Sequence, residues 1–549
     1  MANRVFYDED ARRRVLEGAR ILYEAVKTTM GPKGRNVIID KAYGNPTVTH
    51  DGVTVAKGVE IEDKDDETLG YKVGAELIKQ AANKMNDVAG DGTTTVTVLT
   101  FHILNEANKL IAAGHNPMLL RKGLEQAAHD VIKQLAGMSE DIKANQKRVA
   151  EVATISAGDS QIGDMIADVI SKVGKDGVVT VEEGQSLELE SEVVEGFTMD
   201  RGFVSPYMVT DTTRMEAVVD KPVIVVTDKK ISSVQEFLPI LEKAANEGKK
   251  DLIIIADDVE GEVLGTLILN KLKGVLNAVA VKAPSFGDRR KEELQDIATL
   301  TGATVISEDQ GHTFENMAEQ DVFGSARKVI VTKDDTTIVE GAGSASAVKA
   351  RIAQITSQAN IATSEYDKES LDKRRAALQG KVAVIKVGGA TETEIEEKKY
   401  RVDDAVAAVK AALDEGIVAG GGVTLAELSE KIVVEASDDL AHGKQLLKTA
   451  LLRPFYELLQ NSGLNPDEWW PQVRKAKSGQ GIDVTKPTKL VDLKSTGIVD
   501  PTRVTREAVQ SSVSIAGTAM TMGALVVEVP KEESAPAGGG MPGGGMMGM

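Results

Sequence analysis

The stretch Gly90-Asp91-Gly92-Thr93-Thr94-Thr95 comes directly after a predicted helix over residues 68–89. Its small residues would let backbone N–H groups approach an anion, its hydroxyls add donors, and its carboxylate can hold Mg²⁺ against phosphate oxygens. A helix that starts there would direct the positive end of its dipole at the same anion. The sequence contains no Gly-x-x-x-x-Gly-Lys-Ser/Thr string, so such a site would not be a P-loop. Taken alone, the stretch is also typical of a tight turn with a helix cap.

Outward from this stretch, both ends of the chain are predicted to be mainly helical. The spacing of apolar residues predicts helices over 10–29 and 68–89, and a mostly helical segment from the Gly-Thr stretch to about residue 137. Residues 402–460 have the same pattern, which Gly420-Gly421-Gly422 interrupts. Near the N-terminus, the exceptions are two short strands at Asn36–Ile39 and Thr47–Thr49, followed by a turn at Asp51-Gly52.

The middle of the chain has a different pattern, in which short β-branched runs alternate with helical segments. Such alternation is typical of an α/β domain. Residues 345–379 return to a helical pattern, and Val382–Val387 is predicted to be a strand. The other predicted strands are Val178–Val181, Val223–Val226, Leu252–Ile255, Ala278–Val281, Thr304–Ile306 and Val329–Val331. Residues 531–549 are rich in Gly and Met and are predicted to form a disordered tail, because ordering glycine costs much entropy.

Length and composition predict an acidic, soluble protein of several domains. The chain has 549 residues, which is too long for one core, and a formal net charge of −19. That charge argues against nucleic acid as a partner, and aromatics at 3% leave few stacking platforms for bases. No apolar run approaches the ~20 residues of a membrane span, and the N-terminus does not resemble a signal peptide. With no cysteine either, the expected location is the cytoplasm.

A set of short motifs resembles one family, the group I (GroEL-type) chaperonins, from end to end of the chain. Any one of them could arise by chance, but they occur together and in family order. The family implies a multidomain α plus α/β fold and an ATPase that folds other proteins inside a ring. The motifs, besides Gly90–Thr95, are Thr29-Met30-Gly31-Pro32-Lys33-Gly34-Arg35-Asn36, Asp51-Gly52-Val53, Val281-Lys282-Ala283-Pro284, Phe286-Gly287-Asp288-Arg289-Arg290, Arg401-Val402-Asp403-Asp404-Ala405, Ala419-Gly420-Gly421-Gly422 and Gly497-Ile498-Val499-Asp500-Pro501.

The resemblance implies a discontinuous three-domain subunit. A mainly helical equatorial domain would use residues 1–137 and 415–530 and would bind ATP. A small α/β intermediate domain would use 138–194 and 383–414, and an α/β apical domain at 195–382 would bind substrate and co-chaperonin. Two stacked heptameric rings of identical subunits are the family assembly, with non-native proteins and a GroES-type co-chaperonin as partners.

The resemblance also implies a nucleotide site for ATP, Mg²⁺ and K⁺. Asp91 would coordinate Mg²⁺, Asp51 would act near the γ-phosphate, and Asp404 would orient the attacking water. Asp404 would reach the site only when the intermediate domain closes, although the residue alone is typical of a helix-surface acid. The residues implied to bind nucleotide or its cations are Thr29, Met30, Gly31, Pro32, His50, Asp91, Gly92, Thr93, Thr94, Thr95, Gly421, Asp483, Val484, Thr485, Ile498 and Asp500.

Three positions in this site depart from the family pattern. His50 stands where many members have lysine before Asp-Gly-Val, and Asp483-Val484 stand where Asn-Ala is frequent. If position 50 contributes mainly its backbone carbonyl to K⁺, the change is tolerable. If the ammonium group matters, hydrolysis would slow or depend on pH near ~6.5. The departures leave open a paralogue that holds unfolded proteins and hydrolyses ATP weakly. An unrelated metabolic ATPase or kinase is a third alternative, for which no small-molecule motif is visible.

Two apolar helices in the middle of the chain are predicted to bind clients. Residues 231–241 and 263–272 each carry more apolar residues than one core-facing stripe requires. The surplus side is either buried by a neighbour or exposed to partners. The resemblance favours exposure, since both segments match the family's cavity-facing groove, in which Met208 replaces a common aromatic. The residues implied to bind non-native chains and co-chaperonin are Phe203, Tyr207, Met208, Leu238, Leu241, Leu264, Ile268, Leu269 and Asn270.

Overall fold

The computed structural model describes residues 3–40, 46–63, 65–142, 145–174, 177–184, 186–212, 214–362 and 364–529. The tail that we predicted to be disordered lies outside the described residues. The chain divides into two compact units, which we describe separately. Unit 1 comprises Met1–Asp164 and Tyr400–Met549, and unit 2 comprises Met165–Lys399. The three domains that the resemblance implies form a finer division, whose boundaries stay a prediction.

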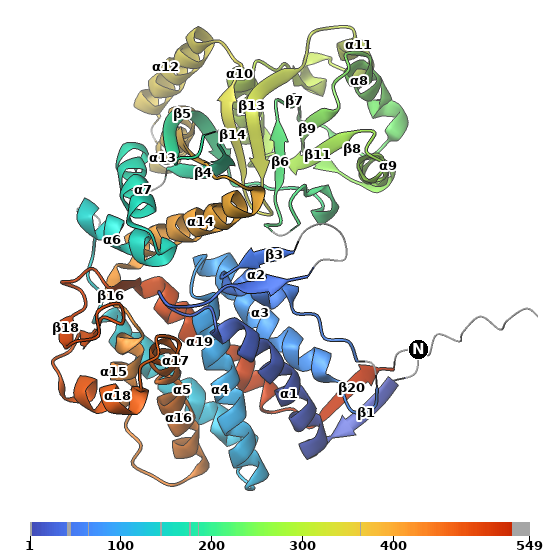
Figure 1. Cartoon of the computed structure of the whole chain (residues 1–549). Helices are drawn as coiled ribbons and strands as arrows, with labels where there is room; N and C mark the ends of the chain where they lie inside the picture. Colours follow the sequence, from blue (N-terminus) through green and yellow to red (C-terminus); the bar gives the residue numbers. More distant parts are fainter. Residues whose placement is uncertain are drawn as a thin grey trace, which may run out of the picture. The chain divides into compact units, whose positions relative to one another are not determined.

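Unit 1 is mainly helical, as the apolar spacing predicted. Its largest core lies between α1, α3, α4, α5 and α19, which pack side by side (Figure 1). The helices of unit 1 are α1 (Asp8–Lys27), α2 (Gly52–Gly58), α3 (Tyr71–Ala89), α4 (Thr93–Ala112), α5 (Pro117–Ala136), α6 (Gln146–Ala157), α15 (Val423–Lys431), α16 (Asp439–Ala450), α17 (Arg453–Asn461), α18 (Pro466–Lys475) and α19 (Thr502–Ala519).

Helices α1 and α3 approach closely because each carries a glycine at the contact. A Cβ on Gly18 would lie 1.8 Å from the backbone oxygen of Tyr71, and a Cβ on Gly74 would lie 1.9 Å from that of Val15. Only glycine fits at either position. The close contact matters for the site, because the chain leaves α1 toward Thr29 and leaves α3 toward Asp91.

Two-stranded sheets complete unit 1, and one of them carries site residues. The pairs are β1 (Asn3–Tyr7) with β20 (Ala524–Glu528), β2 (Val37–Ile39) with β3 (Thr47–Thr49), β16 (Ile417–Ala419) with β19 (Val499–Pro501), and β17 (Gln480–Ile482) with β18 (Leu490–Asp492). All four are antiparallel. The register of β16 on β19 places Val418 opposite Asp500. Two segments that lie about 80 residues apart are thereby joined at the Gly420-Gly421-Gly422 turn.

Unit 2 is the predicted α/β domain, built on one mixed sheet. Its strand order is β11-β9-β7-β13-β14-β5-β15-β4, with β12 paired to β7 and β6 paired to β13. The pairings of β9 with β7 and β11 are parallel, and β7, β9 and β11 are almost entirely buried. The strands are β4 (Val178–Glu183), β5 (Glu190–Met199), β6 (Ala217–Asp220), β7 (Val223–Thr227), β9 (Asp251–Ala256), β11 (Asn277–Lys282), β12 (Val305–Ile306), β13 (Gly324–Val331), β14 (Thr336–Gly341) and β15 (Lys381–Val387).

Helices surround this sheet, and two of them carry the predicted client-binding segments. These are α8 (Val234–Asn246) and α9 (Gly261–Leu272), which are neighbours in unit 2 (Figure 1). A short parallel pair, β8 (Lys230–Ile231) and β10 (Asp258–Val259), lies directly before them in the chain. The other helices are α10 (Gly287–Thr301), α11 (Phe314–Ala318), α12 (Ala345–Ile361), α13 (Glu365–Leu378) and the 3₁₀ turns Pro206–Met208 and Glu308–Gln310.

The chain passes between the units within two helices, α7 (Ser160–Val173) and α14 (Glu392–Glu415). The fold class predicted from the sequence, helical plus α/β, is confirmed. Each predicted strand occurs within two residues of its expected ends except Val329–Val331, because β13 already begins at Gly324. Among the residues that the structure describes, none of the helices combines the length and the apolar composition that crossing a membrane requires.

Candidate functional site

Asp51 does not form a simple turn with Gly52 but is the N-cap of α2. Its carboxylate accepts hydrogen bonds from the backbone N–H groups of Val53 at 3.2 Å and Thr54 at 2.8 Å, and from the Thr54 hydroxyl at 2.5 Å. Its own N–H donates to the Thr49 hydroxyl at 3.1 Å. A short acidic residue at a helix start satisfies donors that lack partners within the helix. The Asp51 carboxylate is therefore held in one orientation.

The Gly90–Thr95 stretch forms the turn between α3 and α4 that the residue pattern indicated. Gly90 and Gly92 have φ values of +67° and +83°, in the left-handed region that favours glycine, and α4 begins at Thr93. Asp91 lies between them and uses both carboxylate oxygens: Oδ1 accepts from the Gly92 N–H at 2.5 Å, and Oδ2 accepts from the Ser156 hydroxyl at 3.1 Å. The start of a twenty-residue helix thus lies beside a fixed carboxylate.

The α2 segment and the end of α1 lie against this helix start. A Cβ on Gly52 would lie 2.5 Å from Oγ1 of Thr94 and 2.7 Å from Oγ1 of Thr93, so the backbone beside Asp51 touches both hydroxyls. The hydroxyls of Thr29 and Thr94 are 3.1 Å apart and share a hydrogen bond. Three sequence motifs that were predicted to bind phosphate therefore meet at the N-terminus of α4.

Asp500 enters the same neighbourhood from β19. A Cβ on Gly420 would lie 3.0 Å from the Asp500 carboxylate, so the glycine turn makes room for it. Burial, and then the negative charge of Asp91, raises the pKa of Asp500 to about 7. Burial likewise raises the pKa of Asp91, with the charge of Asp51 acting in the same direction, against the hydrogen bonds from Gly92 and Ser156. The charge of Asp51 thus contributes to the raised pKa of Asp91, and the charge of Asp91 contributes to that of Asp500.

This carboxylate cluster suits a cation. A carboxylate whose pKa is raised by a neighbouring negative charge is stabilised when a proton or a cation binds beside it. Among the described residues, no group of three or more His, Cys, Asp or Glu side chains converges closely enough to hold a metal by itself. An ion here would need further oxygen ligands, as Mg²⁺ usually does when it binds one or two carboxylates together with phosphates and water.

Helix α14, which carries Asp404, packs on the same turn. A Cβ on Gly90 would lie 2.2 Å from Cβ of Ala407, so α14 packs directly on the Gly90 backbone. Asp404 lies three residues before Ala407 and hence on the same face of the helix. It also belongs to the same compact unit as Asp91. The predicted closure of a separate domain, which would bring Asp404 to the site, stays a prediction.

The other residues predicted to bind nucleotide differ in how exposed they are. Thr95 and His50 are half-buried. Met30 is buried, while Gly31 and Pro32 are exposed in the loop after α1, with Gly31 against Leu458 of α17. Ile498 packs within 4.0 Å of the position that a Cβ on Gly421 would take.

The segment predicted to face the base has its own internal contacts. The Asp483 carboxylate accepts from the N–H of Thr485 at 2.9 Å and from its hydroxyl at 2.6 Å. Val484 is buried in the same apolar cluster as Ile498, and Thr485 is exposed. Asp483 therefore caps a turn here, whereas the structure places Val484 near the predicted base contact.

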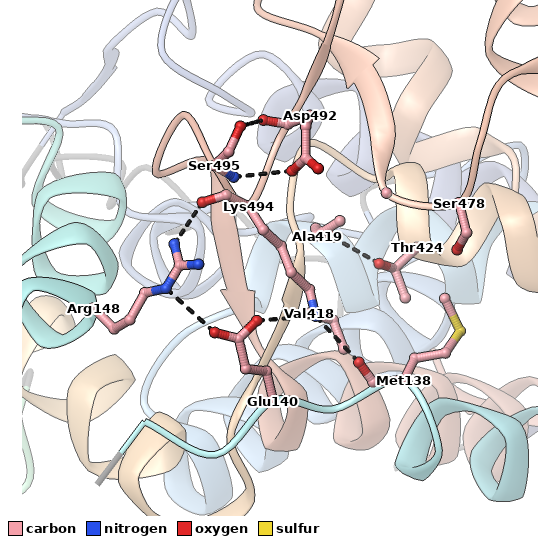
Figure 2. Close-up of a pocket in the computed structure, with 11 residues that line it drawn as sticks. Met138, Glu140, Arg148, Val418, Ala419, Thr424, Ser478, Asp492, Lys494 and Ser495 are labelled. Atoms are coloured by element: carbon pink, nitrogen blue, oxygen red, sulfur yellow. Dashed lines mark hydrogen bonds and ion pairs between the residues drawn. The ribbon is translucent and has the colours of Figure 1, made fainter. Parts of the chain in front are cut away.

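A separate cavity of about 400 Å³ opens in unit 1 beside β16 (Figure 2). It adjoins the glycine turn through Ala419, but the side chains that line it include none of those predicted to bind nucleotide. The basic side chains that line the cavity are already paired with an acid, since Glu140 lies 3.4 Å from Arg148 and 3.5 Å from Lys494. Lys494 also donates to the backbone oxygen of Met138 at 3.3 Å. We therefore assign the polar turn at α4, rather than this cavity, as the candidate nucleotide site.

In unit 2, α8 and α9 leave apolar side chains exposed on their outer sides. Phe237 and Val263 face the core, whereas Leu238 and Leu269 are 41% and 52% exposed. Leu241, Leu264 and Ile268 are partly buried beside them. The amide of Asn270 donates to the backbone oxygen of Thr266 at 2.8 Å. The alternative in which both helices are buried on two sides is thus excluded for this unit.

Comparison with known proteins identifies the family. The model of the TCP-1/cpn60 chaperonin family matches residues 22–530. The chain is a chaperonin. Its fold is similar to that of the chaperonin gp146 from the bacteriophage EL 2 (Pseudomonas aeruginosa), solved in the presence of ATP-BeFx, with a TM-score of 0.63 and 20% identity over 96% of this chain and 99% of that chain. Family membership implies a chaperone that acts on other proteins within a ring oligomer, and group I is consistent with it.

One residue of the predicted client surface of this chaperonin differs from the expectation. Met208 is fully buried, and its sulfur accepts a hydrogen bond from the Ala280 N–H at 3.2 Å. Tyr207 beside it is 70% exposed, and Phe203 is half-buried next to β11. Because successive side chains of a 3₁₀ turn point about 120° apart, Met208 points into the core and supports the segment while Tyr207 points outward.

Two features of this chaperonin were not found from the sequence. Leu272, at the end of α9, is 73% exposed, more than any residue named for the surface. Its place in the predicted segment 263–272 was the signal that could have found it. Ser156 bonds Asp91 across 65 residues, and nothing in its local sequence indicates that contact.

Proposed function

We propose that this chaperonin is an ATP-driven folding machine with ATP, Mg²⁺ and K⁺ as cofactors. Its subunits would bind non-native proteins on α8 and α9, and would hydrolyse ATP at the α4 turn to drive client release. The observation that carries the proposal is the cluster of Asp51, Asp91 and Asp500 at the N-terminus of α4, with the Asp404 helix packed on Gly90.

The phosphates would bind at the start of α4. Its free N–H groups, the positive end of its dipole and the hydroxyls of Thr93, Thr94 and Thr95 all favour an anion. Asp91 would hold Mg²⁺, which when bound neutralises charge on the phosphate oxygens. The surplus negative charge of the cluster is also compatible with a nearby K⁺, for which His50 would offer its backbone carbonyl. Gly421, Ile498 and Val484 would surround the adenosine.

Hydrolysis would depend on placing a water in line with the γ-phosphate. Asp404 would orient that water, and Asp51, fixed by its bonds to α2, would complete the charge arrangement. Phosphoryl transfer needs little beyond positioning and electrostatic stabilisation, so we take Asp404 and Asp51 as the catalytic groups.

Clients would bind to the exposed apolar side chains of α8 and α9, because unfolded chains share apolar groups rather than one shape. We further propose two stacked heptameric rings of three-domain subunits, a GroES-type cap that competes for the same surface, and a cytoplasmic location. A binding paralogue with weak hydrolysis is the alternative, favoured by the turn in which Asp483 is engaged by Thr485.

The test is refolding of a denatured client enzyme in the presence of ATP, Mg²⁺, K⁺ and a GroES-type co-chaperonin. Asp404→Ala should lower ATP hydrolysis about 100-fold or more and abolish recovery, while the client is still captured. The control is Glu396→Ala, which removes an exposed acid from the same helix. Capture without recovery in the unaltered protein would favour the binding paralogue.

A further inference from the structure

Ser156 contacts Asp91 but belongs to none of the sequence motifs. It lies on the last turn of α6, and its hydroxyl donates to Oδ2 of Asp91 at 3.1 Å. The other oxygen, Oδ1, accepts from the Gly92 N–H. These two bonds come from different elements and together fix the rotation of the carboxylate about its last bond. The Gly92 bond alone would leave that rotation less restricted.

Helix α6 is itself firmly placed within unit 1. Its N-cap is Asn145, whose side chain accepts from the Arg148 N–H at 3.3 Å. Arg148 lies 3.4 Å from Glu140 and donates to the backbone oxygen of Lys494 (Figure 2). It also lies 2.8 Å from Glu151 of the same helix. Because these contacts tie α6 to segments on two sides, Ser156 is presented to Asp91 from a rigid support.

The same helix also adjoins the segment that carries Asp500. Helix α6 packs on β19, and a Cβ on Gly497 would lie 3.1 Å from the Glu151 side chain. The apolar face of α6, with Val149, Val152 and Ala153, is buried. One helix thus contacts Asp91 directly and supports the strand of Asp500, so its position affects both carboxylates.

We propose that Ser156 is a positioning residue for the cation site: it holds the Asp91 carboxylate in the orientation that binds the metal of a metal–nucleotide complex. The inference rests on the proposed function and deepens it. Residues that hydrogen-bond a metal-binding carboxylate orient it, and their loss typically costs 10–100-fold in metal affinity. A merely structural hydrogen bond would instead affect metal-bound and metal-free nucleotide equally.

The test compares ADP binding with and without Mg²⁺ by isothermal titration calorimetry on the assembled protein. We expect Ser156→Ala to weaken Mg·ADP binding about tenfold and to leave the binding of ADP in EDTA unchanged. Ser156→Thr, which keeps the hydroxyl, should restore most of the Mg·ADP affinity. Ser160→Ala, at an exposed position just beyond α6, is the matched control and should bind like the unaltered protein.

The outcomes separate this inference from the proposed function. If the unaltered protein binds Mg·ADP and Ser156→Ala retains the same ratio of Mg·ADP to ADP affinity, the role of Ser156 is overturned and the nucleotide site stands. If the unaltered protein binds neither form, both proposals are overturned. Should Ser156→Ala fail to fold, Ser156→Cys keeps the size with a weaker donor, and a Mg²⁺-specific loss is again expected.

Discussion

The two units differ in the polarity and the exposure of the residues that are predicted to be functional. In unit 1 the functional side chains are polar, and the protein itself satisfies them: Asp51 caps α2, Asp91 bonds Gly92 and Ser156, and Thr29 bonds Thr94. In unit 2 they are apolar, and the protein leaves them open, with Leu238 and Leu269 about half exposed. A ligand of one shape is best recognised by groups held in place, whereas chains of many shapes require an adaptable apolar surface.

Separating the two activities would test this contrast most strongly. Asp51→Asn should lower ATP hydrolysis about 100-fold, because it removes a charge that the α2 cap holds in position, and should leave client capture without nucleotide unchanged. Leu269→Ser should do the reverse, with weaker capture and normal hydrolysis in the absence of client. Steady-state ATPase rates and light scattering of an aggregating client measure both. A loss of both activities in either variant would contradict the contrast.

The second prediction compares two leucines on α9 that differ in exposure. Leu267 is 1% exposed and Leu269 is 52% exposed, two positions apart. Leu267→Ala should lower the free energy of unfolding of unit 2 by about 2–5 kcal/mol because it leaves a cavity. Leu269→Ala should change it by less than about 0.5 kcal/mol. Urea unfolding followed by circular dichroism measures both, and equal losses would mean that Leu269 is covered in the protein.

The third prediction concerns the packing of α14 on the nucleotide turn. Gly90→Ala should destabilise unit 1 by about 2 kcal/mol, since the new Cβ would both strain a left-handed residue and overlap Ala407. Ala407→Gly in the same chain should recover the part due to overlap. A double-mutant cycle on thermal unfolding measures the coupling, and purely additive effects would show that Gly90 and Ala407 are not in contact.

The smallest expected effect is a pH dependence from a buried network in unit 1. His102 Nε2 lies 3.2 Å from the Tyr23 hydroxyl, which donates to Glu457 at 2.6 Å. Burial lowers the pKa of His102 below its usual 6.5, so the folded state binds fewer protons than the unfolded state as pH falls. Stability should therefore decline below pH 6.5, by at most about 1.4 kcal/mol per pH unit.

Replacing the histidine isolates that contribution. His102→Gln should flatten the decline of the free energy of unfolding between about pH 6.5 and 5.5. The lowered pKa of Glu457, where hydrogen bonds from His102 and Tyr23 outweigh burial, acts only in more acid solution, below its usual 4.5. The exposed His129, replaced in the same way, controls for the substitution. An unchanged slope in His102→Gln would mean that the imidazole titrates normally.

Sequence by itself determined the family and the fold class, because ordered glycine, threonine and aspartate motifs and apolar periodicity are local properties of the chain. It also identified the α4 turn and the two apolar helices of unit 2. Tertiary structure alone decided which apolar residues face outward, because burial depends on neighbours from other strands and helices. Met208 is fully buried, whereas Leu272 is 73% exposed. It alone decided that Ser156 meets Asp91, because hydrogen bonds across 65 residues follow from helix packing and not from local pattern.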